Sequence, residues 1–146
     1  MNKDSVDTDR QKIRALIEQQ FQSLSWSKGR DGNWPAFEND FLDGARLFPG
    51  ARPVKSTTVP EFVNRMQSLS KSSLGQLDET CLGAKIDVFG NVAVAMAVCE
   101  LVENGTRTSH NVEALLLVKT GGEWKIAAQA WDTAAEGSEL PDELLD

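Results

Sequence analysis

The side chains best suited to chemistry lie in the second half of the chain. His110 is the only histidine, and an imidazole titrates near neutral pH, which suits it to proton transfer. Glu113 stands just before three leucines at 115–117, where a carboxylate must be paired or face a solvent-filled space. Asp132 lies near the end of the last apolar stretch. We therefore take His110, Glu113 and Asp132 as candidate acid/base residues.

Each candidate also has a structural interpretation. A lone histidine more often holds a structural hydrogen bond than a catalytic proton. Glu113 could pair with Arg107 or Lys125 on neighbouring strands, and Asp132 could be a surface residue at a strand end. Side-chain alternation puts His110 and Glu113 on opposite faces of one strand. Because both faces become apolar further along, the pattern does not decide which face lines a pocket.

Other kinds of site have little support in the sequence. The two cysteines, Cys81 and Cys99, are too few for a disulfide framework and lack the spacing of a metal site. With one histidine and no tyrosine, multi-histidine metal sites and tyrosine acids lack their residues. No phosphate-binding glycine loop or nucleophile elbow occurs. We expect reduced thiols, no metal and no cofactor.

The composition predicts one globular domain. The chain has 146 residues, 40% hydrophobic and 25% charged, with a formal net charge of -7, typical of a globular protein except for its acidity. That charge would repel a phosphate backbone, which argues against nucleic acid as a partner. No apolar run suits a signal peptide or a membrane span, so we expect a cytoplasmic location. Residues 136–146 carry five carboxylates and no basic residue, which predicts a solvated acidic tail after a domain at 1–135.

Three helices are predicted in the first half of the chain. Residues 9–26 carry apolar side chains at a helical spacing. A short second helix is expected around Pro35, with Phe37, Phe41 and Leu42 on one side. The third follows a capping box at 58–61.

The second half predicts a sheet. Favourable two-residue turns at 90–91, 104–105 and 121–122 separate long β-prone stretches. They predict four antiparallel strands at 77–89, 92–103, 106–119 and 123–133, with a small hairpin over 45–55 before them. Helices followed by a long curved antiparallel sheet define an α+β fold in which three N-terminal helices close a cone.

Several short segments match a known family: 26–31 (WSKGRD), 41–50 (FLDGARLFPG), 88–93 (VFGNVA), 122–126 (GEWKI) and 131–132 (WD). With the order of elements, they resemble the nuclear transport factor 2 (NTF2) superfamily and its SnoaL-like group over about residues 9–133. The resemblance implies a cystatin-like cone with an interior pocket, and usually a homodimer through the outer face of the sheet. It selects no activity, because isomerases, dehydratases, hydrolases, cyclases and proteins without a known reaction look alike at these positions.

Active sites known in this superfamily do not transfer to the chain. The ketosteroid isomerases use an aspartate base opposite a tyrosine and a protonated aspartate, but this sequence has no tyrosine. Asp40 and Asp43 flank Phe41 and Leu42 on the expected second helix, where an exposed carboxylate is commoner than a catalytic one. Limonene epoxide hydrolases orient a water with two aspartates and an arginine, and Arg107 or Arg46 with Asp132 does not reproduce their spacing.

The interior and exterior of the cone can also be predicted. We expect an apolar pocket lined by Trp26, Phe41, Phe48, Met66 and Trp131. Along 92–99, alanines and a cysteine alternate with valines and a methionine. We expect the small alanine face to meet a second subunit and the larger face to meet the helices.

The sequence supports two main functions and does not decide whether a reaction is catalysed. The first is a homodimer that binds a small apolar or amphipathic molecule in each cone. The alternative is a small isomerase, dehydratase or hydrolase that uses His110, Asp132 or Glu113 in the same pocket. A purely structural role would require a filled cone.

Overall fold

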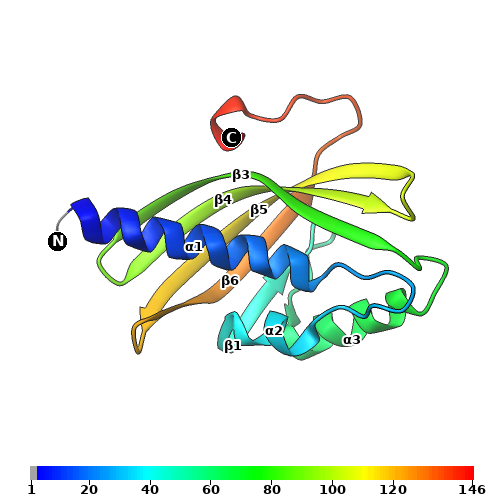
Figure 1. The fold of residues 1–146 in the computed structure, drawn as a ribbon, viewed down its shortest axis with the longest axis horizontal. Coiled ribbons are helices and arrows are strands. Elements are labelled where there is room, and N and C mark those ends of the chain that lie inside the picture. The colour runs from blue at the N-terminus through cyan, green and yellow to red at the C-terminus, as the bar shows by residue number, and fades with distance from the viewer. Residues whose placement is uncertain (1–2) are drawn as a thin grey trace.

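A computed structural model describes residues 3–146 (Figure 1). Its helices are α1 (Lys3–Ser23), α2 (Trp34–Asn39) and α3 (Val59–Ser70), with a short 3-10 helix, η1 (Asp142–Leu144). Its strands are β1 (Phe41–Phe48), β2 (Thr57–Thr58), β3 (Leu77–Phe89), β4 (Val92–Glu103), β5 (Arg107–Thr120) and β6 (Glu123–Thr133). The four predicted long strands and the capping box of Thr58 and Glu61 are confirmed.

All six strands form one sheet in the order β2-β1-β6-β5-β4-β3. The sheet is mixed, so the purely antiparallel prediction is wrong: β1 runs parallel to β6, while every other pair is antiparallel. The chain leaves β1 through β2 and α3, crosses to β3 and returns by the meander, which brings β6 alongside β1 in the same direction. Register shifts with extra residues in β3, β6 and β1 bend the sheet, as bulges do.

The first half of the chain departs from the prediction at three boundaries. α1 begins at Lys3, six residues earlier than expected, and Asp9 in its second turn is buried against Trp124. α2 ends at Asn39, so Phe41 starts β1 and pairs with Ile126 instead of continuing the helix. The expected hairpin exists only as β1 with the two-residue β2, because the chain from 49 to 56 forms a loop.

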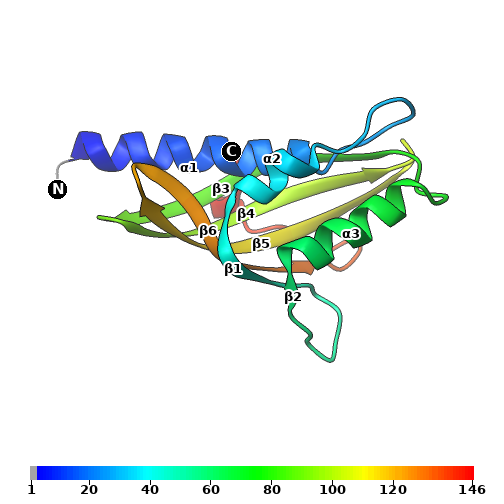
Figure 2. The same cartoon turned by 90° about the horizontal axis from the view of Figure 1, so that it is seen from below.

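The core lies between α1 and the concave face of the sheet (Figure 2). Ile13, Ile17 and Phe21 of α1 are buried at 1% exposure or less. The alanines of β4 belong to the same core, so the prediction that they meet a second subunit is wrong. α1 packs most closely against β3, and the larger alternate side chains of 92–96 face outward, at 42–52% exposure.

The acidic tail folds back onto the sheet through Leu144, while its five acidic residues stay exposed, as expected of a solvated segment. Leu144 is 4% exposed and η1 contacts β3 and β4. The Asp146 backbone N–H donates to the Leu82 carbonyl of β3, and the Asp146 carboxylate forms an ion pair with Arg14 of α1. The tail therefore crosses the outer edge of β3 to reach α1.

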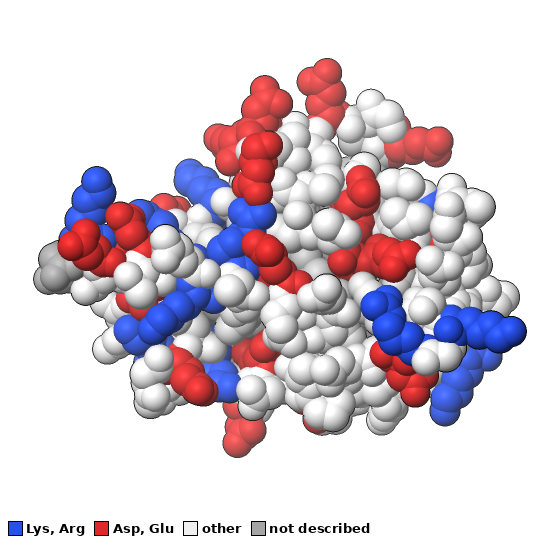
Figure 3. Space-filling view, viewed as in Figure 1, with Lys and Arg blue, Asp and Glu red and all other residues white. Residues whose placement is uncertain are grey.

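Charged side chains of both signs alternate along α1, whereas carboxylates gather over the C-terminal segment at the top of the view (Figure 3). Within residues 3–146, no helix is long and apolar enough to cross a membrane.

Candidate functional site

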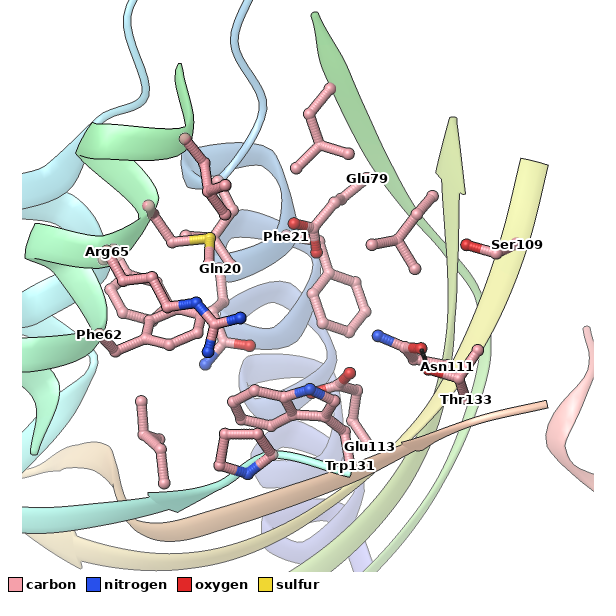
Figure 4. Close-up of a pocket in the computed structure, with 18 of the residues that line it drawn as sticks. Gln20, Phe21, Phe62, Arg65, Glu79, Ser109, Asn111, Glu113, Trp131 and Thr133 are labelled. Carbon is pink, nitrogen blue, oxygen red and sulfur yellow. Dashed lines mark hydrogen bonds between the residues drawn. The ribbon is translucent and has the colours of Figure 1, made fainter. Parts of the chain in front are cut away.

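A cavity of about 270 Å³ lies between the concave face of the sheet, α1 and α3 (Figure 4). Its walls are mainly apolar. Aromatic rings come from every side, since Phe21 belongs to α1, Phe62 to α3 and Trp131 to β6. Phe62 and Trp131 meet edge to face at a centroid separation of 5.5 Å. Ring surfaces and leucines thus give a cavity suited to an apolar body.

A hydrogen-bonded polar network lies at the wall formed by α1, β5 and β6. The side-chain amides of Gln20 and Gln129 form a reciprocal pair, with N···O distances of 2.7 and 3.0 Å. The Gln129 amide also donates to Glu113 at 2.7 Å. All three residues are buried, at 1%, 4% and 6% exposure. The two amides hydrogen-bond mainly to each other. Glu113, at the end of this network, is a buried acid that lines the cavity.

The Glu113 carboxyl holds its proton more tightly than usual. Burial raises its pKa to about 7, although hydrogen bonds from Gln129 and Asn111 favour the ionised form. Asn111 is held in turn by Thr133, whose hydroxyl donates to the Asn111 side-chain oxygen at 2.8 Å. At neutral pH, Glu113 can therefore exist in both protonation states and exchange a proton with a bound molecule.

A second carboxyl, Glu79 of β3, lines the same cavity. Burial and the charge of Glu113 raise the pKa of Glu79 to about 8, while a hydrogen bond with Cys99 opposes the shift. The Cys99 thiol donates to the Glu79 carboxylate at 3.3 Å. The negative charge of Glu113 therefore disfavours ionisation of Glu79 in the same cavity, so the two carboxyls form a pair that resists carrying two charges at once.

Other polar groups line the rest of the cavity. Ser109 and Thr133 contribute hydroxyls, Glu103 a carboxylate and Arg65 a guanidinium. Arg65 is an exposed residue of α3 whose side chain extends toward Trp131 (Figure 4). Among residues 3–146, no carboxylate lies within ion-pair distance of Arg65, so its guanidinium is available to an anionic group.

The three candidate acid/base residues do not converge. Glu113 lies in the cavity, but His110 and Asp132 belong to the opposite, outer face of the sheet. The His110 ring nitrogen is 3.0 Å from Glu100, and the Asp132 carboxylate accepts from the Thr133 backbone N–H. Alternation along β5 explains this separation, because residues an odd number of positions apart point to opposite faces.

The structure also corrects the expected partners and lining. Glu113 pairs with Gln129, whereas Arg107 lies 4.0 Å from Glu103 and Lys125 donates to the Asn39 carbonyl. Of the five residues expected to line the pocket, Trp26, Met66 and Trp131 do so. Phe41 packs in the core and Phe48 borders a groove on the outer face.

Sequence reasoning missed Glu79, Gln20, Gln129 and Arg65. Two of them had a usable signal. Gln20 interrupts the apolar stripe of α1 between Ile17 and Phe21, and a buried amide on such a stripe requires a polar partner. Glu79 lies two residues from both Leu77 and Cys81 on β3. Residues two apart on a strand share a face, so the sequence places Glu79 on an apolar face.

Asp40, at the end of α2, is a further buried acid. It is 8% exposed, and burial raises its pKa to about 7. With the Gln19 amide turned to satisfy its neighbours, the Gln19 nitrogen donates to both Asp40 oxygens. Asp40 does not line the cavity. In the described part of the chain, no group of three or more His, Cys, Asp or Glu residues is arranged to hold a metal ion.

Comparisons with known proteins identify the fold. No protein-family model matches the chain, and no curated protein matches it in sequence. Among solved structures, an NTF2-like protein of unknown function from Pseudomonas putida KT2440 is similar, with a TM-score of 0.72 and 15% identity over 93% of this chain and 96% of that one. A cystatin-like protein of unknown function from Nostoc punctiforme PCC 73102 gives a TM-score of 0.70 and 13% identity, covering 88% and 93%.

A third similar structure, an NTF2-like protein of unknown function from Methylobacillus flagellatus KT, is 18% identical over 88% of this chain and 94% of that one, with a TM-score of 0.64. The chain therefore has the NTF2-like, cystatin-like α+β fold, as the resemblance predicted. The narrower SnoaL-like assignment stays a prediction, because these proteins are described only by the broader fold.

Proposed function

We propose that the protein binds one small amphipathic molecule inside the cone. The apolar body of the ligand would lie against the aromatic and leucine side chains, and a polar group would reach Glu113. The observation that carries this proposal is a buried, hydrogen-bonded polar network on one wall of an otherwise apolar cavity. Such convergence of a few polar groups in an apolar cavity is typical of small-molecule sites.

The same proposal includes a homodimer formed through the outer face of the sheet. Val92, Val94, Met96 and Leu116 leave 42–52% of their surface exposed on neighbouring strands, and the face around Met96 and Leu116 is hollowed into an apolar groove. A contiguous apolar patch on an antiparallel sheet favours a second apolar surface. The tail already covers Val98, which would bound the interface at that end.

A second candidate function is acid/base catalysis on the bound molecule. It is favoured by the coupled carboxyls, because the pKa values of Glu113 and Glu79, about 7 and about 8, lie near the pH at which a general acid or base works best. In this version, Glu113 and Glu79 would exchange protons with the ligand. His110 and Asp132 would take no part, since they lie on the other face.

Filling the cavity tests ligand binding. Native mass spectrometry of the gently purified protein is expected to show a retained small molecule on the wild-type chain. Met66→Trp places a larger ring in the cavity wall and should remove that mass. Ala51→Trp, in the exposed loop after β1, is the matched control and should retain it.

Two results would contradict the proposal. One is retention of the same molecule by Met66→Trp, which would place the ligand elsewhere. The other is a wild-type protein that carries no ligand and is not stabilised against heating by any member of a small-molecule fragment screen, because a ligand that binds the native state must raise its stability.

A further inference from the structure

The carboxyl pair in the cavity has no cationic partner. Among residues 3–146, no lysine, arginine or histidine nitrogen lies within 4.0 Å of Glu113 or Glu79, since every ion pair involves other carboxylates. Arg65 is the one basic residue among those lining the cavity, yet it does not lower the pKa of either glutamate. Neutral hydrogen-bond donors therefore support the ionised pair, but no positive charge of the described chain balances it.

The walls around the pair favour a positive charge. Phe21, Trp26, Phe62 and Trp131 line the cavity, and the faces of aromatic rings attract cations, more strongly where water is excluded. The chain also carries a formal net charge of -7, which attracts small cations toward its clefts. Carboxyls, rings and net charge thus act in the same direction.

We propose that the ligand carries a primary or secondary amine, which enters as an ammonium group and pairs with Glu113 and Glu79 while its apolar body lies against the rings. This inference rests on the proposed ligand-binding function and specifies the class of ligand. An ammonium group would supply the positive charge that the pair lacks, whereas an anionic head group would meet like charge at this wall.

Binding of an amine should release protons. Near neutral pH the free pair holds at least part of a proton, because burial and mutual repulsion favour the neutral forms. An arriving ammonium stabilises both carboxylates, so the proton leaves for solvent while the ammonium keeps its own. The other charged or titratable groups that face the pair are Cys99 and Glu103 on β4 and Arg65 on α3. The residues of α1 and β6 that line the cavity are all uncharged, and among them Gln20 and Gln129 are the amides of this wall.

The test compares three probes with one skeleton: 2-phenylethylamine, 2-phenylethanol and phenylacetate. Titration calorimetry on the full chain at neutral pH should show the amine binding at least tenfold more tightly than the alcohol, with phenylacetate weakest. Repeating the amine titration in phosphate and in HEPES, which differ in ionisation enthalpy and contain no primary or secondary amine, should give different apparent enthalpies, because released protons are taken up by the buffer.

Matched variants locate the effect. Glu113→Gln and Glu79→Gln each replace a carboxyl by a neutral group of the same shape, and each should reduce the preference for the amine over the alcohol to about twofold or less. Glu100→Gln is the control, since Glu100 belongs to β4 but pairs with His110 on the outer face, and it should leave the preference unchanged.

The outcomes separate this inference from the proposed function. Equal binding of amine and alcohol, or an amine preference that survives in both variants, overturns the amine inference and leaves ligand binding in place. Tighter binding of phenylacetate overturns it as well and would assign the head group to Arg65. If none of the probes binds and Met66→Trp does not change the mass of the purified protein, the proposed function fails with it.

Discussion

Glu113 lowers the stability of the fold as the pH rises, because a buried carboxyl resists ionisation. Its pKa is 4.5 in an ordinary setting and about 7 in the folded protein. Below pH 4.5 both the folded and the unfolded chain hold the proton, and the group adds no penalty. Between the two values, the unfolded chain gives up its proton first, so stability falls until the folded pKa is passed.

We expect the free energy of unfolding of the wild type, relative to Glu113→Gln, to fall by roughly 2–3 kcal/mol between pH 5 and pH 8, because the neutral glutamine has no proton to lose. Urea denaturation of both proteins at the two pH values measures this difference. Glu100→Gln serves as the reference for a carboxylate on the outer face. An identical pH dependence of wild type and Glu113→Gln would show that Glu113 ionises as freely in the folded protein as in the unfolded chain.

At the scale of the elements, the bounds of the long strands could be predicted from local turn signals. The end of α2 depends on contacts between residues far apart in the sequence. β3 and β4 have the predicted bounds, and β5 differs by one residue, because turn pairs such as Asn104-Gly105 can be recognised without knowledge of the fold. The end of α2 could not be predicted, since Phe41 leaves the helix to pair with Ile126 on the last strand. Long-range contacts also form the site. The sequence places Glu113 on a strand face, but only the folded chain brings Gln20 of α1 and Gln129 of β6 to it.

The tail and β3 fit together at Gly83. A Cβ atom at this position would lie 2.0 Å from the Leu144 carbonyl oxygen and 2.7 Å from Leu145 Cα. Neither backbone atom can move without lifting η1 off the sheet. Gly83 pairs with Val98 of β4, which is fully buried, and η1 contacts both strands. The absent side chain is therefore what allows the tail to dock.

Gly83→Val should release the tail and destabilise the fold by about 1–3 kcal/mol, the usual cost of overpacking. Limited proteolysis should then cleave within 136–146 much faster than in the wild type, with the rest of the chain intact. Gly75→Val is the control, because a Cβ at Gly75 meets no atom within 4 Å. If the tail of Gly83→Val stays as resistant as that of the wild type, the close packing at this position is not what holds it.

At the scale of the whole molecule, the two faces of the sheet have different surroundings. The concave face is covered by α1 and encloses the cavity, whereas the outer face presents apolar side chains to solvent. The alternation along β4 was recognised in the sequence, but its assignment was inverted, because small side chains suit a covering helix as well as a second subunit. To decide which face of β4 is buried in the core and which is exposed, the position of α1 in the folded chain must be known.

Light scattering of the wild-type chain at micromolar concentration should give twice the monomer mass of 16.0 kDa. Met96→Glu places a charge in the centre of the outer face and should yield a monomer, since an unpaired buried charge opposes association. Ala15→Glu makes the same change in charge on the exposed side of α1 and should remain dimeric. A wild-type protein that stays monomeric at these concentrations would remove the interface.

The docked tail also affects the tendency of the protein to aggregate at high concentration. β3 is an edge strand, and the exposed hydrogen-bonding groups of an edge strand can recruit strands from other chains into open-ended assemblies. Asp146 occupies the Leu82 carbonyl on that edge, and its ion pair with Arg14 holds the segment in place. High salt weakens such an exposed pair, so turbidity and fibre formation on storage should increase with ionic strength.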